Sequence, residues 1–182
     1  MAKILTAVRH AKSSWRDPSL SDKKRPLNAR GKMAAPAMAR YLLRLEHLPQ
    51  ALLSSPARRA WDTAALMAAE FGILESAIKK DDRLYFDGMS GILDAVRDTD
   101  DAIDHLFFFS HEPIIGDFCR QYADLDPLVN YPTAAVCAMQ FEVDHWRDIG
   151  QVSGKSEKGK KGHINKAQKL FFVIPKKIDP AL

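Results

Sequence analysis

The stretch 3–13 (KILTAVRHAKS) joins an apolar run to an arginine, a histidine and a lysine, and it decides how the chain is expected to fold. Residues 3–8 are mostly apolar and rich in strand formers, so they predict a strand. Arg9, His10 and Lys12 come at once after it, at the point where this strand ends. In open α/β sheets, ligands bind at the carboxyl ends of the strands. The stretch therefore predicts the first strand of such a sheet and one side of a polar site.

Further apolar runs and helical periodicities alternate along the rest of the chain. These patterns predict strands at 3–8, 51–53, 78–84, 105–109, 134–141 and 168–174, and helices at 29–48, 57–71, 92–97 and 114–122. Strands that alternate with helices predict an α/β fold, with a mostly parallel central sheet flanked by helices on both faces.

The length and composition of the chain exclude several classes of protein. With 182 residues, of which 46% are hydrophobic and 27% charged, the chain is long enough for one domain with a sizeable core. Its two cysteines, Cys119 and Cys137, are too few for a disulfide scaffold or a cysteine-based zinc site. No apolar run is long enough to span a membrane, and charged residues come too early for a secretory signal. We expect residues 1–182 to form a single domain in a reducing, cytoplasmic setting.

The net charge of +4 is divided unevenly along the chain. Residues 1–40 hold ten Lys and Arg against only Asp17 and Asp22, and residues 151–182 hold eight Lys against two acids. Residues 153–165 are rich in Gly, Ser and Lys, which is typical of a mobile surface loop. A nucleic-acid-binding protein would more often spread its charge over one broad face. The basic zone at 1–40 therefore requires a chemical explanation.

Three of the expected strands end on side chains that suit an anion. The segments directly after them are 9–13 (RHAKS), 54–59 (SSPARR) and 110–113 (SHEP), and the last two lead into helices. Arginine side chains and helix amino termini both bind phosphate-like anions. A neutral imidazole is a good nucleophile toward phosphorus, and flanking arginines favour its neutral form. These segments predict a phosphoryl-transfer site that uses neither a metal nor another cofactor.

The same segments carry a resemblance to a known family. Residues 8–13 (VRHAKS) resemble the Arg-His-Gly/Ala signature of the histidine phosphatase superfamily, which has the phosphoglycerate mutase-like fold. Residues 54–64 (SSPARRAWDTA) resemble its second motif, and 110–113 resemble its third. The segment 22–31 (DKKRPLNARG) and the small size are similar to the SixA-type phosphohistidine phosphatase branch. The resemblance runs from about residue 3 to 147 and implies a three-layer sandwich.

The resemblance also implies roles for individual residues. Four are implied to be catalytic, the first as the phosphorylated nucleophile and the others as ligands of the phosphoryl oxygens: His10, Arg9, Arg59 and His111. Three more are candidates for substrate binding: Arg25, Lys12 and Ser13. The register of the second motif gives the phosphate-binding role to Arg59 and leaves Arg58 on the helix surface.

The sequence indicates the proton donor for the leaving group less clearly than it indicates the nucleophile. Larger superfamily members supply an acid after the third strand, and the matching region 84–88 offers Asp87. Glu112 stands where the third motif usually has Asn, beside the expected anion pocket. Asp87 and Glu112 are therefore the candidate acids, although Asp87 beside Gly88 is also typical of an ordinary turn.

The residues and the resemblance together predict a metal-free phosphatase that forms a covalent phosphohistidine intermediate and acts on phosphohistidine of a partner protein. One alternative is a small-molecule phosphomonoesterase with the same pocket. Another is a protein that binds phosphorylated partners without turnover, which the presence of all four catalytic residues disfavours. A third, from a different class, is nucleic-acid or membrane-surface binding by the Lys-rich tail. Its eight lysines are spread over 32 residues, so neither nucleic acid nor a membrane is the expected partner.

The remaining histidines and motifs have structural interpretations. Four histidines are expected to be structural or solvated: His47, His105, His145 and His163. Residues 154–156 (GKS) resemble part of a phosphate loop but lack the glycine that such a loop needs five residues earlier. A metal site at His10 is also disfavoured, because Arg9 would repel a cation and no close His, Asp or Glu pair has a zinc spacing.

Overall fold

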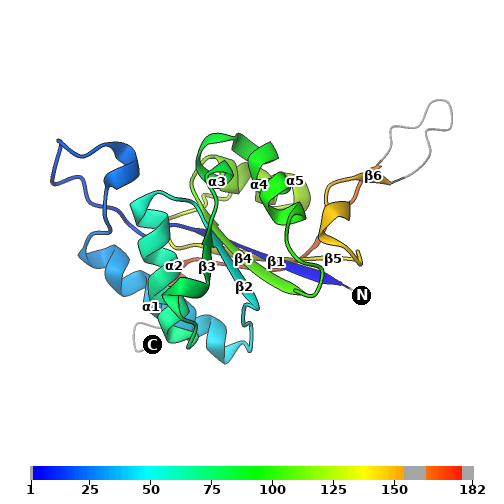
Figure 1. Cartoon of the computed structure of the whole chain (residues 1–182), viewed down its shortest axis with the longest axis horizontal. Coiled ribbons are helices and arrows are strands. Elements are labelled where there is room, and N and C mark those ends of the chain that lie inside the picture. Colours follow the sequence, from blue (N-terminus) through cyan, green and yellow to red (C-terminus); the bar gives the residue numbers. More distant parts are fainter. Residues whose placement is uncertain (1, 154–162, 178–182) are drawn as a thin grey trace.

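A six-stranded sheet forms the middle layer of the computed structural model, which describes residues 2–153 and 163–177 (Figure 1). The strands lie in the order β3-β2-β4-β1-β5-β8. Their bounds are β1 (Lys3–Arg9), β2 (Ala51–Ser54), β3 (Ile78–Lys80), β4 (His105–Ser110), β5 (Val136–Phe141) and β8 (Gln168–Val173). The first four in chain order are parallel, and β5 and β8 run antiparallel to their neighbours. The mostly parallel sheet expected from the sequence is confirmed.

Helices cover both faces of this sheet (Figure 1). On one face lie α1 (Ala29–Arg44) and α2 (Arg58–Glu70), and on the other α3 (Arg83–Phe86), α4 (Gly88–Arg97) and α5 (Ile114–Tyr122). Short 3-10 turns are η1 (Asp22–Lys24), η2 (Glu75–Ala77), η3 (Trp146–Asp148) and η4 (Pro175–Lys177), and β6 (Val152–Ser153) pairs with β7 (His163–Ile164). The α/β sandwich predicted from the alternating pattern is therefore the observed architecture.

The central strand β4 divides the hydrophobic core into two. Successive side chains of a strand point to opposite faces, and every residue of β4 is buried. Leu106 and Phe108 pack with the core under α4 and α5, whereas Phe107 and Phe109 pack with the core under α1 and α2. A strand that is apolar on both faces can lie only in the middle of a covered sheet. His111, directly after β4, is thereby placed at the centre of one sheet edge.

Three elements end earlier or begin later than the sequence pattern indicates. The strand expected at 78–84 stops at Lys80, because the Asp81 carboxylate accepts hydrogen bonds from the backbone N–H and the guanidinium of Arg83 and starts a helical turn. The helix expected at 29–48 stops at Arg44, with Glu46 in a left-handed conformation at φ 54°. The strand expected at 134–141 begins at Val136, because Ala134 has a φ of 61°.

The expectation of a loop at 153–165 falls largely on residues 154–162, which lie outside the described residues. No helix in the described part of the chain is long and apolar enough to cross a membrane.

Candidate active site

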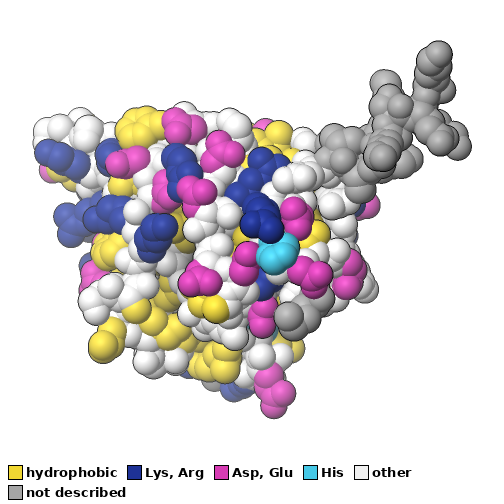
Figure 2. Space-filling model, turned by 45° about the vertical axis from the view of Figure 1, so that its right-hand side comes forward, with side chains coloured by type: hydrophobic (Ala, Val, Ile, Leu, Met, Phe, Trp, Pro, Cys, Tyr) yellow, Lys and Arg dark blue, Asp and Glu magenta, His cyan; other side chains and the backbone are white. Residues whose placement is uncertain are grey.

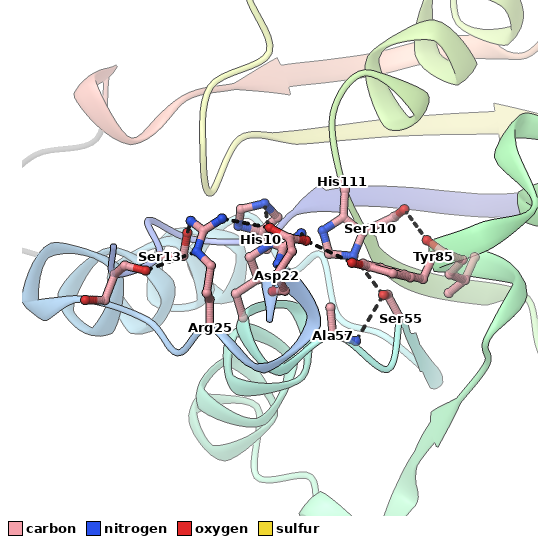
Figure 3. A network of polar contacts seen from close by, with 12 residues as sticks. His10, Ser13, Asp22, Arg25, Ser55, Ala57, Tyr85, Ser110 and His111 are labelled. Carbon is pink, nitrogen blue, oxygen red and sulfur yellow. Dashed lines mark hydrogen bonds and ion pairs between the residues drawn. The ribbon is translucent and has the colours of Figure 1, made fainter. Parts of the chain in front are cut away.

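Three neighbouring strands end at one edge of the sheet and bring the three motif segments together. Strand β4 pairs in parallel with both β1 and β2, with Arg9 opposite Ser110 and Ser54 opposite Phe109. Since parallel strands share their carboxyl edge, the residues directly after each strand meet there. Segments that are about 50 residues apart in sequence thus form one polar cluster (Figure 3).

His10 lies at the centre of this cluster and is held in one tautomer. Its Nδ1 lies 2.8 Å from the Ala11 carbonyl oxygen, which can only accept, so Nδ1 carries the proton. Its Nε2 accepts a hydrogen bond of 3.2 Å from Nε of Arg59. Burial lowers the pKa of His10 to about 3, and the nearby Arg59 charge adds to this although the Ala11 hydrogen bond opposes it. At neutral pH, the ring is therefore neutral and its Nε2 lone pair faces an arginine.

Asp22 joins the arginines of the site into one network (Figure 3). Its carboxylate accepts from Arg59 Nη2 at 2.8 Å and from Arg25 Nη1 at 2.7 Å, and its backbone carbonyl accepts from Arg59 Nη1 at 2.7 Å. The Tyr85 hydroxyl donates to the same carboxylate at 2.8 Å. Burial alone would raise the pKa of Asp22, but the hydrogen bonds from Tyr85 and Arg59 hold it below its usual value. Asp22 is therefore an anion placed between two cations.

The three expected substrate-binding residues occupy different places. Arg25 is buried and donates to the Ser13 hydroxyl at 2.6 Å and to the Ser14 carbonyl at 3.1 Å. Ser13 is also buried, so its hydroxyl holds the Arg25 guanidinium in place. Lys12 is exposed, and its side chain lines two surface hollows beside the site.

His111 faces His10 across the pocket, with ring centroids 5.1 Å apart. Its Nε2 lies 2.7 Å from the hydroxyl of Ser55, which itself accepts from the Ala57 N–H. Ser55 can then donate its proton to Nε2, which leaves the His111 proton on Nδ1. Burial, and to a lesser extent the neighbouring His10 and Arg59, lower the pKa of His111 to about 3. His111 therefore presents a neutral N–H donor.

Two unpartnered buried donors belong to this cluster. Among the described residues, only three buried side-chain nitrogens or oxygens lack a hydrogen-bond partner, and they include Nδ1 of His111 and Nε of Arg9. The Arg9 Nη1 is fixed by the Tyr131 carbonyl at 2.6 Å, and the Arg9 charge lowers the pKa of both His10 and His111. Buried polar groups in proteins are nearly always satisfied, so unpartnered donors of this kind are suited to an anionic ligand.

Neither candidate acid makes a polar contact with the histidines of the site in the described structure. Asp87 is exposed at the start of α4 and makes no side-chain capping bond. Glu112 is half-buried, and its carboxylate accepts from the Gly116 N–H at 3.2 Å, within the first turn of α5. Burial raises the pKa of Glu112, while the Gly116 hydrogen bond and the Arg9 charge lower it again.

Sequence reasoning did not assign roles to Asp22, Ser55, Tyr85 or Thr63. Thr63 accepts from the Ala11 N–H at 2.9 Å and donates to the Arg59 carbonyl at 2.6 Å, so it ties the His10 loop to α2. The one available signal concerned Asp22, since it is one of two acids in a zone of ten cations. An isolated acid there is a natural partner for arginines that converge on one site.

Arg58, next to Arg59, points away from the cluster. Its side chain is 63% exposed and pairs at 3.6 Å with Asp62 on the surface of α2. Arg59 therefore lies on the side of α2 that faces the cluster, as the register of the second motif predicts.

Two comparisons of sequence each match less than half of the chain. Residues 5–85 match the model of the histidine phosphatase superfamily (branch 1). An uncharacterized chloroplastic protein of Arabidopsis thaliana is 40% identical over 79 residues, which are 43% of this chain and 36% of that protein. The match thus spans about a third of the length of the curated relative.

Solved structures resemble the whole chain in fold. A candidate SixA phosphohistidine phosphatase of Agrobacterium tumefaciens superposes with a TM-score of 0.73 at 20% identity, covering 95% of this chain and 98% of that one. The protein histidine phosphatase SixA complexed with tungstate superposes with a TM-score of 0.74 at 15% identity, covering 95% of this chain and 97% of that one. A mycobacterial glucosyl-3-phosphoglycerate phosphatase superposes with a TM-score of 0.60 at 14% identity, covering 93% of this chain and 98% of that one. At these identities the likeness concerns the fold.

Proposed function

We propose that the chain is a phosphatase of the histidine phosphatase superfamily, whose model matches residues 5–85, and that His10 takes the phosphoryl group from a phosphohistidine of a partner protein. The observation that carries this proposal is the state of His10. Its Nδ1–H is fixed on the Ala11 carbonyl and its Nε2 is unprotonated at neutral pH. A nucleophile needs such an unprotonated nitrogen, and most surface histidines have no fixed tautomer. The hydrogen bond that Nε2 accepts from Arg59 must open when this nitrogen attacks.

In the first step, Nε2 of His10 attacks phosphorus and the bond from phosphorus to the substrate imidazole breaks. The leaving imidazole takes a proton from solvent, since its unperturbed pKa is about 6.5. Arg9, Arg59 and the Nδ1–H of His111 hold the phosphoryl oxygens, and the Ala11 carbonyl stabilises the positive charge that develops on the His10 ring. In the second step, the oxygen of a water molecule attacks the phosphorus and the bond from phosphorus to Nε2 of His10 breaks. The water gives up a proton to solvent, inorganic phosphate leaves, and Nε2 regains its lone pair.

The test is the loss of the nucleophile. His10→Ala should lose essentially all turnover of a phosphohistidine peptide, and the wild type should keep its activity in EDTA. Mass spectrometry without acid quenching should find one phosphoryl group on the peptide that contains His10. Continued turnover by His10→Ala would contradict the covalent mechanism.

A small-molecule phosphomonoesterase is the second candidate, favoured by the half-buried Glu112 with its raised pKa beside Arg9. An alkoxide needs a proton donor to leave, whereas a phenolate needs little help. With Asp87 exposed and Glu112 turned to α5, we expect aryl phosphates to react much faster than alkyl phosphates. Asp87→Asn should change phosphohistidine turnover less than about tenfold, a small effect for a general acid. Fast alkyl phosphate hydrolysis that Asp87→Asn or Glu112→Gln abolishes would favour the second candidate.

A further inference from the structure

Two adjoining hollows open beside the active site, where the loop after β1 meets the start of α1. The larger has a volume of about 540 Å³ and is lined by residues 12–16, 26–30 and 32. The smaller, of about 260 Å³, lies between α1 and η4 and includes Lys176 in its wall. Lys12 and Arg30 line both hollows, so the two share one wall. We call them together the basic hollows.

The basic hollows carry positive charge that no described residue neutralises. Five cations line them: Lys12, Arg16, Arg30, Lys32 and Lys176. All five are exposed, none forms an ion pair with a described residue, and no Asp or Glu lines either hollow. On the face that Figure 2 shows, many Asp and Glu side chains lie among the Lys and Arg side chains. Four of the ten cations in the basic zone at 1–40 thus line the hollows.

The basic hollows are held firmly against the catalytic loop. The Lys12 carbonyl accepts from the Asn28 N–H at 2.9 Å, and the Asn28 side chain caps α1 by accepting from the Gly31 N–H. Ser13, in the wall of the larger hollow, accepts from Arg25, which pairs with Asp22 in the site. These bonds fix the wall of the hollows to the loop that follows His10.

An exposed aromatic side chain indicates what kind of ligand lies there. Trp15 lines the larger hollow with 74% of its surface exposed, and its ring stacks on the Arg25 guanidinium at 3.2 Å. Exposed tryptophan and arginine are enriched in protein–protein contacts, where they act as anchors. The five cations come from the loop after β1, from α1 and from η4, so they suit an extended ligand better than a single small anion.

We propose that the basic hollows bind an acidic segment that flanks the phosphorylated residue of the protein substrate. This inference rests on the proposed function, because it assigns the hollows to the substrate of His10. Opposite charges on enzyme and substrate raise the rate of encounter and select partners more than they change the chemical step. The hollows thus determine which phosphoproteins reach His10.

The experiment compares two synthetic phosphohistidine peptides, one with glutamates flanking the phosphohistidine and one with glutamines at the same positions. The wild type should have a kcat/KM about tenfold higher for the glutamate peptide at low salt, and the preference should shrink as salt screens the charges. Arg30→Glu with Lys176→Glu should abolish the preference through KM. Turnover of an aryl phosphate should stay unchanged, which shows that the fold and His10 are intact.

A matched control removes the same charge elsewhere. Arg44→Glu with Lys79→Glu changes two exposed cations, one at the far end of α1 and the other on β3. Arg44 lies about 21 Å along the helix from Arg30, and neither Arg44 nor Lys79 lines a hollow. This control pair should keep the preference for the glutamate peptide.

Several results would overturn the proposal. Equal kcat/KM of the wild type for both peptides would do so, as would an equal loss in the test and control variants. Loss of the preference in micromolar tripolyphosphate, together with tight binding of that anion, would assign the hollows to a small polyanion instead. If neither peptide is turned over, the proposed function fails, and fluorescence anisotropy of the unphosphorylated peptides still tests the hollows separately.

Discussion

The carboxylate of Asp22 lies between two arginine side chains of the site. It pairs with Arg59 and Arg25, and it accepts a hydrogen bond from the Tyr85 hydroxyl. An arriving phosphoryl group needs some of the same donors, so Asp22 competes with it. Asp22 also fixes the position of Arg59, whose Nε points at His10. The side chain is thus expected to weaken anion binding while it orders the site.

Replacing Asp22 separates these two effects. Asp22→Asn should bind tungstate more tightly, on the order of tenfold, because a competing charge-assisted partner of the arginines is lost. It should also turn over more slowly, because Arg59 is less firmly oriented. Inhibition of aryl phosphate hydrolysis by tungstate measures the first effect and kcat measures the second.

The control for this variant is Asp17→Asn. Asp17 lies in the same loop, but its carboxylate bonds only to Ser19 among the described residues. It should leave tungstate inhibition unchanged. Weaker tungstate binding by Asp22→Asn would mean that Asp22 supports the anion site and does not compete with it.

The two neighbouring arginines of α2 provide a second comparison at this scale. Arg59→Ala should lower kcat on the order of 10²–10³, the usual cost of removing a donor that stabilises transition-state charge. Arg58→Ala removes an exposed side chain that pairs with Asp62 on the surface of α2, so its effect should be small. Steady-state kinetics on one substrate measures both, and equal effects would show that the helix register is wrong.

At the scale of elements, the start of α1 is fitted onto the catalytic loop at Gly31. A Cβ atom at this position would lie 2.3 Å from the Lys12 carbonyl oxygen, which is a backbone atom. The helix and the loop after His10 can therefore approach only because residue 31 has no side chain. This contact places the basic hollows and the His10 loop side by side.

Gly31→Ala tests this contact. Alanine favours a helix over glycine by about 1 kcal/mol, but overpacking against a backbone atom typically costs about 1–3 kcal/mol. We expect a net loss of stability together with a lower kcat, since the His10 loop must shift. Urea unfolding monitored by circular dichroism measures the loss of stability.

The control is Met33→Ala, on the exposed face of the same helix, which should change stability by less than about 0.5 kcal/mol. A Gly31→Ala variant as stable as this control would contradict the tight fit.

At the scale of the whole molecule, the core contains histidines that are neutral only because they are buried. His47 and His105 share the Thr6 hydroxyl, at 2.8 Å and 3.0 Å, on the side of the sheet covered by α1 and α2. Burial lowers the pKa of His47 to about 4 and that of His105 to about 3. His10 and His111, at the other end of the strands, have pKa values lowered in the same direction.

These pKa values predict loss of stability in mild acid. Each of these histidines binds its proton in the unfolded chain below a pH of about 6.5 but stays neutral in the folded protein. The contribution of these neutral histidines to the free energy of unfolding is therefore fully present above a pH of about 6.5. It is lost as the pH falls toward 4. At pH 5, one such histidine lowers the free energy of unfolding by about 2 kcal/mol, because each pH unit below 6.5 contributes about 1.4 kcal/mol. Several together approach the whole free energy of unfolding of a domain, so acid unfolding should occur above pH 4.

Urea titrations between pH 7 and pH 4 measure this effect. His105→Gln should flatten the pH dependence, even if it lowers stability at pH 7. His145→Gln is the control, because His145 is 44% exposed and lies outside the core. This variant should lose stability in acid as the wild type does, since its buried histidines are intact. A wild type equally stable at pH 7 and pH 4.5 would contradict the neutral state of the buried histidines.

The sequence by itself determined the elements whose signal is local. The apolar runs at 3–8 and 105–109 and the helical periodicity at 114–122 predicted β1, β4 and α5, because a period of two or of 3.6 is visible within a few residues. It also determined that His10, Arg59 and His111 come after three strands, and parallel strands share one carboxyl edge. The end of β3 at Lys80 was missed, because one side-chain hydrogen bond to Asp81 overrides the local pattern.

Only the tertiary structure decided what surrounds those residues. The order β2-β4-β1 makes the three strand ends neighbours, and chain order does not reveal it. Asp22 meets Tyr85 although 63 residues separate them, and Ser55 meets His111 across 56. Such contacts arise from how loops fold over the sheet edge, which no local period records. The charge of 1–40 was visible in the sequence, but its arrangement as two hollows beside His10 depends on the packing of α1 against the His10 loop.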